Sequence, residues 1–324
     1  MSEASGHESS GNKAIIAAFL ANLGIAITKF IAWAFSGSAS MLAEGIHSVA
    51  DTGNQLLLLF GGRQARRKAD RTHPFGYGRE RYVYAFVVAI ILFSVGGVFS
   101  LYEGWGKLMN PHPLEVWWLP VLVLLVAAVM ESFSLRTALR ESKKPRAGRS
   151  LWQFIRRAKA PELPVVLLED IAALTGLLFA LIGVVLSILT GNAVWDALGS
   201  IAIGLLLIAV AVILGIETKS LLVGEGASER DLAAIEKAIL THPDTHLIHM
   251  KTLYLGPDEL MVGAKIGFPA DRRLLQISAE VDAMEDRIRQ AVPIAKVIYI
   301  EPDVYVNPDH PDPPTDTIVL KASD

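Results

Sequence analysis

The sequence predicts an α-helical membrane protein with six transmembrane helices, followed by a small α+β domain whose elements run in the order αββαβ. Hydrophobic residues make up 52% of the 324 residues, and the mean hydropathy is +0.41, which is too apolar for an ordinary soluble protein. Six apolar stretches are long enough to cross a bilayer core of about 30 Å. After Gly215 the apolar character gives way to patterns typical of a soluble domain.

The six predicted spans form a transmembrane transport domain, residues 13–216, which follows a short disordered tail, residues 1–12. The spans cover approximately residues 13–35, 39–62, 81–105, 116–137, 163–190 and 194–216. Lys and Arg crowd the second and fourth connections, whereas the first, third and fifth hold only Lys107. The positive-inside rule therefore predicts a multi-pass protein with both termini in the cytoplasm, in the inner or plasma membrane if the cell is bacterial.

The basic fourth connection is expected to include a short helix, residues 150–159, lying on the membrane surface. Its charge favours contact with anionic lipid headgroups, and we expect no binding of nucleic acid. In the sixth span, Asp196 is expected to cap the start of its own helix. Glu131, near the expected end of the fourth span, is interpreted as a solvated carboxylate assisted by Ser132 and Ser134.

The cytoplasmic domain, residues 217–305, is predicted from local patterns. Ser228 and Asp231 make a capping-box-like start for a helix over 228–241. Two alternating segments, 246–255 and 259–268, read as strands joined by a GPD turn, and a helix over 274–292 precedes a third strand over 295–302. This order predicts two helices on one side of a three-stranded sheet. The Pro- and Asp-rich tail, residues 306–324, is expected to be irregular.

The stretch AEGIHSVADTGNQ, residues 43–55, carries the main functional signal. It places Glu44, His47, Asp51 and Asn54 along one stripe of the second span, where each polar group is costly unless it finds a partner. Ionisable groups at membrane depth are by default functional candidates. An imidazole and a carboxylate four residues apart supply half of a transition-metal site.

The fifth span supplies the other half of the predicted site, because Glu169 and Asp170 interrupt its otherwise apolar run. The candidate ligands are therefore His47, Asp51, Glu169 and Asp170, and the absence of cysteine excludes thiolate ligands. A structural hydrogen-bonded pair between helices is the alternative reading of His47 and Asp51. Glu44 and Asn54 are accessory candidates, for which a solvated carboxylate and an interhelical hydrogen bond, respectively, are the alternatives.

These features resemble the cation diffusion facilitator family, over residues 13 to about 305. The most specific residues are the HxxxD of the second span, the segment DRTHPFGYGRER over residues 70–81, and the acidic motif of the fifth span. The resemblance implies a homodimeric transporter, not an enzyme, that exports zinc or related divalent ions in exchange for protons. It also implies a four-ligand site between the second and fifth spans and no cofactor besides the transported ion. The sequences of the motifs in the second and fifth spans are similar to those of the family branch that includes the mitochondrial and nuclear-associated zinc transporters of animals.

Two departures from the family pattern affect the expected ligands. The fifth span of many members reads HxxxD, but Val166 stands at the histidine position here, and Glu169 could move into the gap. The resulting site is richer in oxygen, so manganese or ferrous iron are alternatives to zinc. The loop after the second span matches the family's accessory metal site at Asp70 and His73 but has Tyr77 at the last position, so HPFGYG could instead be a structural turn.

The cytoplasmic domain offers weaker candidates for metal binding. His246 and His249 are expected on opposite faces of a strand, which prevents a shared site unless a bulge intervenes. Glu301 and Asp303 could attract an ion at a dimer interface.

The implied mechanism is alternating access, in which one midplane site opens to either side of the membrane. Metal loading needs neutral His47 and ionised carboxylates, so it displaces protons. No GxxxxGK[ST] loop provides for nucleotide binding. The alternatives are a divalent cation channel, an intramembrane metalloenzyme, and a transport-inactive protein that senses metal or regulates a partner.

Overall fold

The computed structural model describes residues 23–111, 116, 118–146 and 148–305. The predicted tails, 1–12 and 306–324, and the start of the first predicted span lie outside these ranges. Contacts divide the chain into two compact units. The helical unit comprises the chain up to Arg63 together with Arg81–Lys219, and the sheet unit comprises Gln64–Glu80 and the chain from Ser220 onward.

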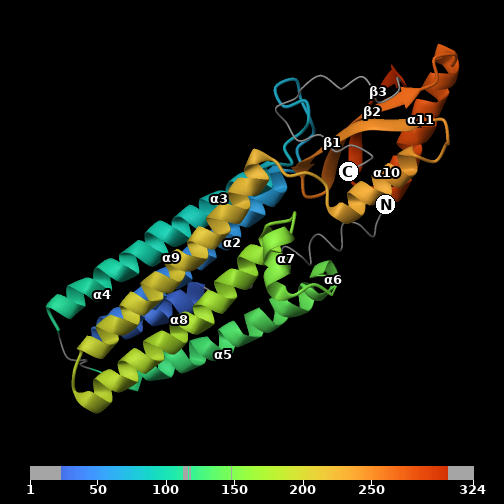
Figure 1. Cartoon of the computed structure of the whole chain (residues 1–324). Coiled ribbons are helices and arrows are strands. Elements are labelled where there is room, and N and C mark those ends of the chain that lie inside the picture. The colour runs from blue at the N-terminus through green and yellow to red at the C-terminus, as the bar shows by residue number, and fades with distance from the viewer. Residues whose placement is uncertain (1–22, 112–115, 117, 147, 306–324) are drawn as a thin grey trace, which may run out of the picture. The chain divides into compact units, whose positions relative to one another are not determined.

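The helical unit is a bundle of long helices, and each predicted span corresponds to a helix (Figure 1). The first helix is described over Leu23–Ser36. The other spans are α2 (Ala39–Gln64), the continuous run of α3 (Glu80–Ile91), η1 (Leu92–Val98) and α4 (Phe99–Met109), and then α5 (Trp118–Glu141), α8 (Glu162–Thr190) and α9 (Val194–Val223). The run Glu80–Met109 and the helices α5, α8 and α9 are each long and apolar enough to cross a membrane. Helix α2 is not among these apolar helices, because its polar stripe interrupts the apolar run.

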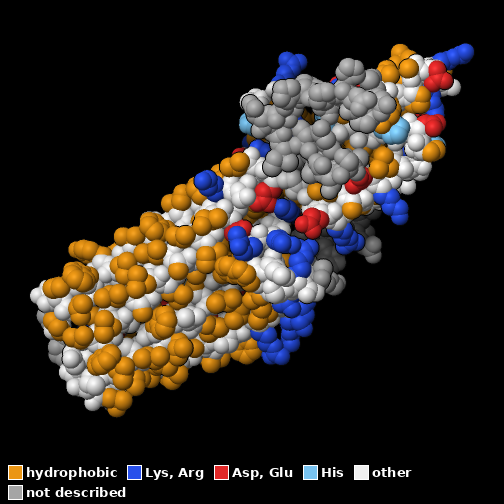
Figure 2. All heavy atoms as spheres, viewed as in Figure 1, with side chains coloured by type: hydrophobic (Ala, Val, Ile, Leu, Met, Phe, Trp, Pro, Cys, Tyr) orange, Lys and Arg blue, Asp and Glu red, His pale blue; other side chains and the backbone are white. Residues whose placement is uncertain are grey.

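The exterior of the bundle fits a membrane environment. Large apolar side chains such as Phe133 and Leu189 are exposed, and in Figure 2 hydrophobic side chains cover the length of the bundle. Lys and Arg side chains gather at one end of it. The short helices α6 (Lys143–Arg146) and α7 (Leu151–Arg157) belong to the basic fourth connection, and a capping box between Ser150 and Gln153 begins α7. The helix predicted over 150–159 is thus observed as α7, and its position on the membrane surface stays a prediction.

Glycines allow α9 to pack directly against the backbone of α4 and η1. A Cβ at Gly204 would come within 2.9 Å of the carbonyl oxygen of Gly97 and 2.8 Å of the amide nitrogen of Leu101. Ser200 in α9 donates a hydrogen bond of 2.9 Å to the carbonyl oxygen of Ser100. Small residues at such contacts let membrane helices approach closely, so backbone packing joins these two spans.

Asp196 caps a different helix from the one we expected. It lies in the first turn of α9, but its carboxylate accepts hydrogen bonds from the Ser38 hydroxyl at 2.7 Å and from the backbone amide of Ala39 at 2.8 Å, at the start of α2. Lys107 of α4 approaches the same carboxylate at 3.1 Å. The prediction of a cap on its own helix was therefore wrong, because the free amide groups of α2 lie within its reach.

The sheet unit has the predicted αββαβ order. Its elements are α10 (Glu229–Ile239), β1 (His246–Gly256), β2 (Glu259–Phe268), α11 (Leu274–Ala291) and β3 (Ala295–Val304). The strand order is β1-β2-β3, with β1 antiparallel and β3 parallel to β2. Apolar residues of both helices pack on one sheet face, which includes Met250, Val262 and Ile266. Among the described residues of this unit, neither helix covers the other face, which we call the open face and which lines a cavity of about 640 Å³.

The loop after α2 packs with the sheet unit, although we expected it to belong with the helices. A Cβ at Gly78 would come within 2.7 Å of the carbonyl oxygen of Leu255, and Gly256 lies directly beside Gly78. Only glycine permits this approach without a shift of the backbone. Residues 64–80, which connect α2 to α3, therefore pack against the β1–β2 turn.

Candidate metal centre

The polar stripe of α2 lies inside the helical bundle. Glu44, His47 and Asn54 are buried, and Asp51 is 15% exposed. A helix keeps residues three or four positions apart on one face, so the spacing in the sequence brings these four side chains to one side of α2. The structure thus confirms the stripe, and the neighbouring helices determine what each member contacts.

Glu44 already has a cationic partner. Lys29 of the first helix donates to Glu44 Oε2 at 2.9 Å and to the Ser48 hydroxyl at 2.7 Å, and both charged side chains are fully buried. Gly176 of α8 makes room for the carboxylate, because a Cβ there would come within 2.7 Å of Glu44 Oε1. This geometry favours a charge-balancing role for Glu44. Lys29 was not among the residues predicted to matter, although its position within the first apolar run was the available signal.

His47 and Asp51 are neighbours, as their spacing predicts. His47 Nε2 lies 3.4 Å from Asp51 Oδ2, beyond the usual length of a hydrogen bond between such groups. Neither ring nitrogen of His47 has a hydrogen-bond partner among the described residues, and Asp51 Oδ1 also has none. Buried polar atoms normally find partners, so these atoms are available to a ligand.

Glu169 and Asp170 of α8 contact different neighbours. Asn54 of α2 donates a hydrogen bond of 2.7 Å to Glu169 Oε1, which ties the two polar helices together. The Ser134 hydroxyl of α5 lies 3.1 Å from Asp170 Oδ1 and 3.2 Å from Oδ2. Asn54 therefore makes the expected interhelical hydrogen bond. Ser134 was expected to assist Glu131, but its hydroxyl contacts Asp170.

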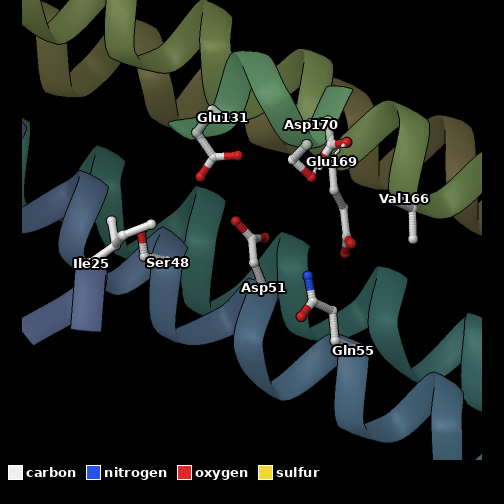
Figure 3. A pocket seen from close by; sticks show the side chains of 9 residues that line it. Ile25, Ser48, Asp51, Gln55, Glu131, Val166, Glu169 and Asp170 are labelled. Carbon is white, nitrogen blue, oxygen red and sulfur yellow. Dashed lines mark hydrogen bonds between the residues drawn. The ribbon is translucent and has the colours of Figure 1, made fainter. Parts of the chain in front are cut away.

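These side chains surround a small polar cavity of about 20 Å³, enough for one water-sized occupant. Figure 3 shows Asp51 of α2 facing Glu131 of α5 and the acidic pair of α8 across this space. Its lining comprises Ile25, Ser48, Asp51, Gln55, Glu131, Ser134, Val166, Glu169 and Asp170. His47 is not part of it. In the described part of the chain, no three His, Asp or Glu side chains converge closely enough to hold a metal ion.

The position of Glu131 corrects our interpretation of that residue. We expected a carboxylate near the membrane face, but α5 continues to Glu141, so Glu131 lies well inside the helix and lines the cavity. The Ser132 hydroxyl donates to the Ala128 carbonyl oxygen and does not assist Glu131. The spacing of three residues between Glu131 and Ser134 was the signal that both share one helix face.

The model of the cation efflux transmembrane domain matches residues 15–223, which is more than half of the chain. The chain belongs to the cation diffusion facilitator family. This is a family of transporters and not of enzymes. Membership agrees with the long apolar helices and the small three-stranded sheet unit described above.

Similar proteins carry related names. The proton-coupled zinc antiporter SLC30A9, mitochondrial, of Xenopus laevis is 34% identical over 269 residues, which are 81% of this chain and 48% of that protein. Metal tolerance protein C4 of Arabidopsis thaliana is 31% identical over 259 residues, covering 79% and 57% of the two chains. The cation-efflux pump FieF of Shewanella oneidensis is 39% identical over 103 residues, covering 32% and 34%. This cation diffusion facilitator spans about half the length of the first two relatives.

In this cation diffusion facilitator, the loop candidate Asp70 forms the centre of a compact turn. Asp70 Oδ1 accepts hydrogen bonds from the backbone amides of Thr72 and His73, and Oδ2 accepts one of 2.6 Å from the Tyr77 hydroxyl. These bonds lower the pKa of Asp70, with the Tyr77 hydroxyl as the largest cause, and the same bond raises the pKa of Tyr77. His73 Nδ1 lies 3.7 Å from Asp70 Oδ1, so the two accessory candidates are adjacent. The turn gives Asp70 a structural role, and metal binding there stays a prediction.

The histidines of β1 share a face of the sheet, contrary to the simple alternation we expected. A β-bulge lies between Leu247 and His249, so His246 pairs with Gly267 and His249 with Lys265. Both partners lie on the open face of β2, because Ile266 between them is buried in the core. The β-bulge is the feature that we expected to be necessary for His246 and His249 to lie on the same face.

Lys265 engages the two acidic candidates of β3. Its ammonium lies 3.3 Å from Glu301 Oε1 and 2.9 Å from Asp303 Oδ2. These contacts raise the pKa of Lys265, with the Asp303 hydrogen bond as the largest cause, and the same hydrogen bond lowers the pKa of Asp303. A lysine therefore occupies the place at which we expected an ion.

Proposed function

We propose that this chain is a secondary transporter that exports divalent transition-metal cations from the cytoplasm in exchange for protons. Zinc is the first candidate, and manganese and ferrous iron are alternatives. The observation that carries the proposal is the small polar cavity between α2 and α8, which is lined by Asp51, Glu169 and Asp170 in a member of a cation efflux family. The relatives named as proton-coupled zinc antiporters support both the cargo and the counter-ion.

The proposed ligands of the transported ion are His47, Asp51, Glu169 and Asp170. Carboxylates gathered in a medium of low dielectric repel one another, so an empty site is costly unless protons or a cation neutralise it. A divalent ion and protons therefore compete for the same atoms, which suits the site to exchange. His47 does not line the cavity in this structure, so its binding to the ion requires α2 and α8 to shift relative to one another.

Transport by the purified protein tests this proposal. Proteoliposomes with an imposed pH gradient are offered zinc, manganese, iron, cobalt, nickel and cadmium in turn. We expect saturable uptake that depends on the gradient. Asp51→Asn and Asp170→Asn should each abolish it while the protein remains folded, because Asn keeps the volume and loses the charge. Flux that is independent of pH and does not saturate would instead indicate a channel.

Two further variants address the departure at Val166. Val166→His, combined with Glu169→Leu, restores the more common ligand set and should shift preference toward zinc and cadmium, since imidazole is the softer donor. Glu169→Ala tests whether Glu169 binds the metal ion. Unchanged metal affinity and ion preference in that variant would remove Glu169 from the ligand set. Folded protein that binds metal but moves none would favour the sensing or regulatory alternative.

A further inference from the structure

Glu131 reaches the proposed metal site from a third helix. It lies in the interior of α5, and its side chain lines the same cavity as Asp51, Glu169 and Asp170. In Figure 3 the carboxylates of Glu131 and Asp51 point toward one another from facing helices. A cation held between α2 and α8 would therefore face this carboxylate as well.

The neighbouring serine fixes the orientation of α5. Ser134, three residues after Glu131, contacts both carboxylate oxygens of Asp170 at 3.1 and 3.2 Å. Residues three apart lie on one side of a helix. Glu131 is thus on the face of α5 that packs against the site, whereas Phe133 on the same turn is 64% exposed.

The other acidic groups near the cavity have partners. Lys29 pairs with Glu44, Asn54 donates to Glu169, and Ser134 contacts Asp170. The hydrogen bonds and ion pairs among the described residues leave Glu131 without such a partner, and the facing Asp51 Oδ1 is buried without one. Carboxylate oxygens without a partner are costly within a membrane bundle, and a divalent cation between Glu131 and Asp51 Oδ1 would satisfy both.

We propose that Glu131 supplies a metal-binding carboxylate, so that the site takes its ligands from α2, α5 and α8. This inference rests on the proposed transport function. It assigns to α5 a ligand that compensates for the missing imidazole at Val166. Because the added donor is an oxygen, Glu131 strengthens binding of harder ions such as manganese relative to softer ones such as cadmium.

Direct binding of Mn²⁺ and Cd²⁺ to the purified full chain tests this assignment, together with transport in proteoliposomes. Loss of groups that merely orient metal ligands costs about 10- to 100-fold in affinity, and loss of a ligand should cost at least as much. We expect Glu131→Gln to weaken Mn²⁺ binding by this factor and Cd²⁺ binding by less. Glu131→Asp should recover part of the loss. The control Glu103→Gln, a carboxylate on α4 outside the cavity, should bind both ions as the unmodified chain does.

The outcomes separate this inference from the proposed function. Glu131→Gln with unchanged affinity for both ions overturns the assignment, even if transport falls, provided that Asp51→Asn abolishes binding. If Glu131→Gln does not fold, Glu131→His decides, because a ligand at this position should shift preference toward zinc and cadmium. A folded Glu131→His variant with unchanged preference contradicts the assignment. An unmodified chain that neither binds nor transports any of the metals overturns the proposed function itself.

Discussion

Lys29 lies in the interior of the helical bundle, where its side chain pairs with Glu44. Its ammonium contacts Glu44 and Ser48, and its side chain is fully buried. A buried ion pair contributes little net stability compared with apolar residues, but removal of one member leaves the other charge without compensation. Lys29 therefore offsets the free-energy cost of burying the Glu44 carboxylate inside the bundle.

Replacing Lys29 should destabilise the protein strongly. We expect Lys29→Met to lower the free energy of unfolding by about 3–5 kcal/mol, because Glu44 is left buried without a counter-charge. Thermal unfolding of the detergent-solubilised protein measures the loss. The double variant Lys29→Met/Glu44→Gln should recover most of it. A double variant as unstable as the single one would show that Lys29 acts through packing and not through Glu44.

The turn around Asp70 gives a pH dependence whose sign follows from the structure. A carboxylate whose pKa is lowered on folding stabilises the fold above its unfolded pKa, and this contribution is lost as the pH falls through the folded pKa. Tyr77→Phe removes the largest cause of the lowering, so the pKa of Asp70 should rise and the acid-induced loss of the turn should begin at higher pH. The carboxyl carbon shift of isotopically labelled aspartate, assigned with Asp70→Asn, follows this change. The control Tyr299→Phe should leave the Asp70 titration unaltered.

At the level of elements, the packing of α4 and η1 against α9 depends on backbone contact. Gly204 stands at its centre, where an added Cβ meets backbone atoms that cannot rotate away. The π-helical turn η1 lies beside this contact and carries Gly97, whose carbonyl oxygen would lie only 2.9 Å from a Cβ at Gly204. The interface should therefore tolerate no larger residue at Gly204.

Gly204→Ala should thus destabilise the bundle by about 1–3 kcal/mol, the usual cost of overpacking. Gly215 on the same helix is the matched control, since a Cβ there meets nothing within 4 Å. Gly215→Ala should be neutral or slightly stabilising, because alanine is the better helix former. Thermal unfolding of both variants, measured side by side, tests the contact. Equal effects of the two substitutions would mean that the close approach contributes nothing.

The elements themselves follow from local sequence patterns, and the exceptions follow from contacts between distant residues. The strands β1, β2 and β3 and the helices α10 and α11 begin and end close to the predicted residues, since alternation and capping signals are local. The bulge in β1 is not visible in the spacing of His246 and His249. Asp196 caps α2 because two helices far apart in sequence meet there. Likewise, the helix face on which Glu131 lies could be assigned only once α5 was seen packed on α8.

At the level of the whole molecule, the charge distribution predicts orientation in the membrane. Reporter fusions after residues 110 and 150 should report opposite sides, with residue 150 in the cytoplasm, because the basic residues lie in the second and fourth connections. The same side for both fusions would contradict the six-span arrangement. Fusions at the two termini should both report the cytoplasm.

The open face of the sheet is the expected site of dimer contact. It includes Tyr299, which is 59% exposed, and lines the 640 Å³ cavity with His249 and Lys251. We expect the full chain in detergent to be a dimer by light scattering, and Tyr299→Asp to increase the monomer fraction. Leu275→Asp, at an exposed position of α11 away from that face, should not. A monomer at all accessible concentrations of the unmodified chain would contradict this prediction.

The cap that Asp196 forms on α2 also has a mechanical consequence. The first turn of α2 is fastened to α9 through a carboxylate that accepts from Ser38 and Ala39. The helix that carries His47 and Asp51 is therefore anchored at its start to a neighbour that contributes no side chain to the cavity lining. If the helices move during transport, we therefore expect the first turn of α2 to stay with the start of α9. The hydrogen bond from Asn54 to Glu169 joins α2 to α8 beside the cavity, so a movement of α2 relative to α8 must break it.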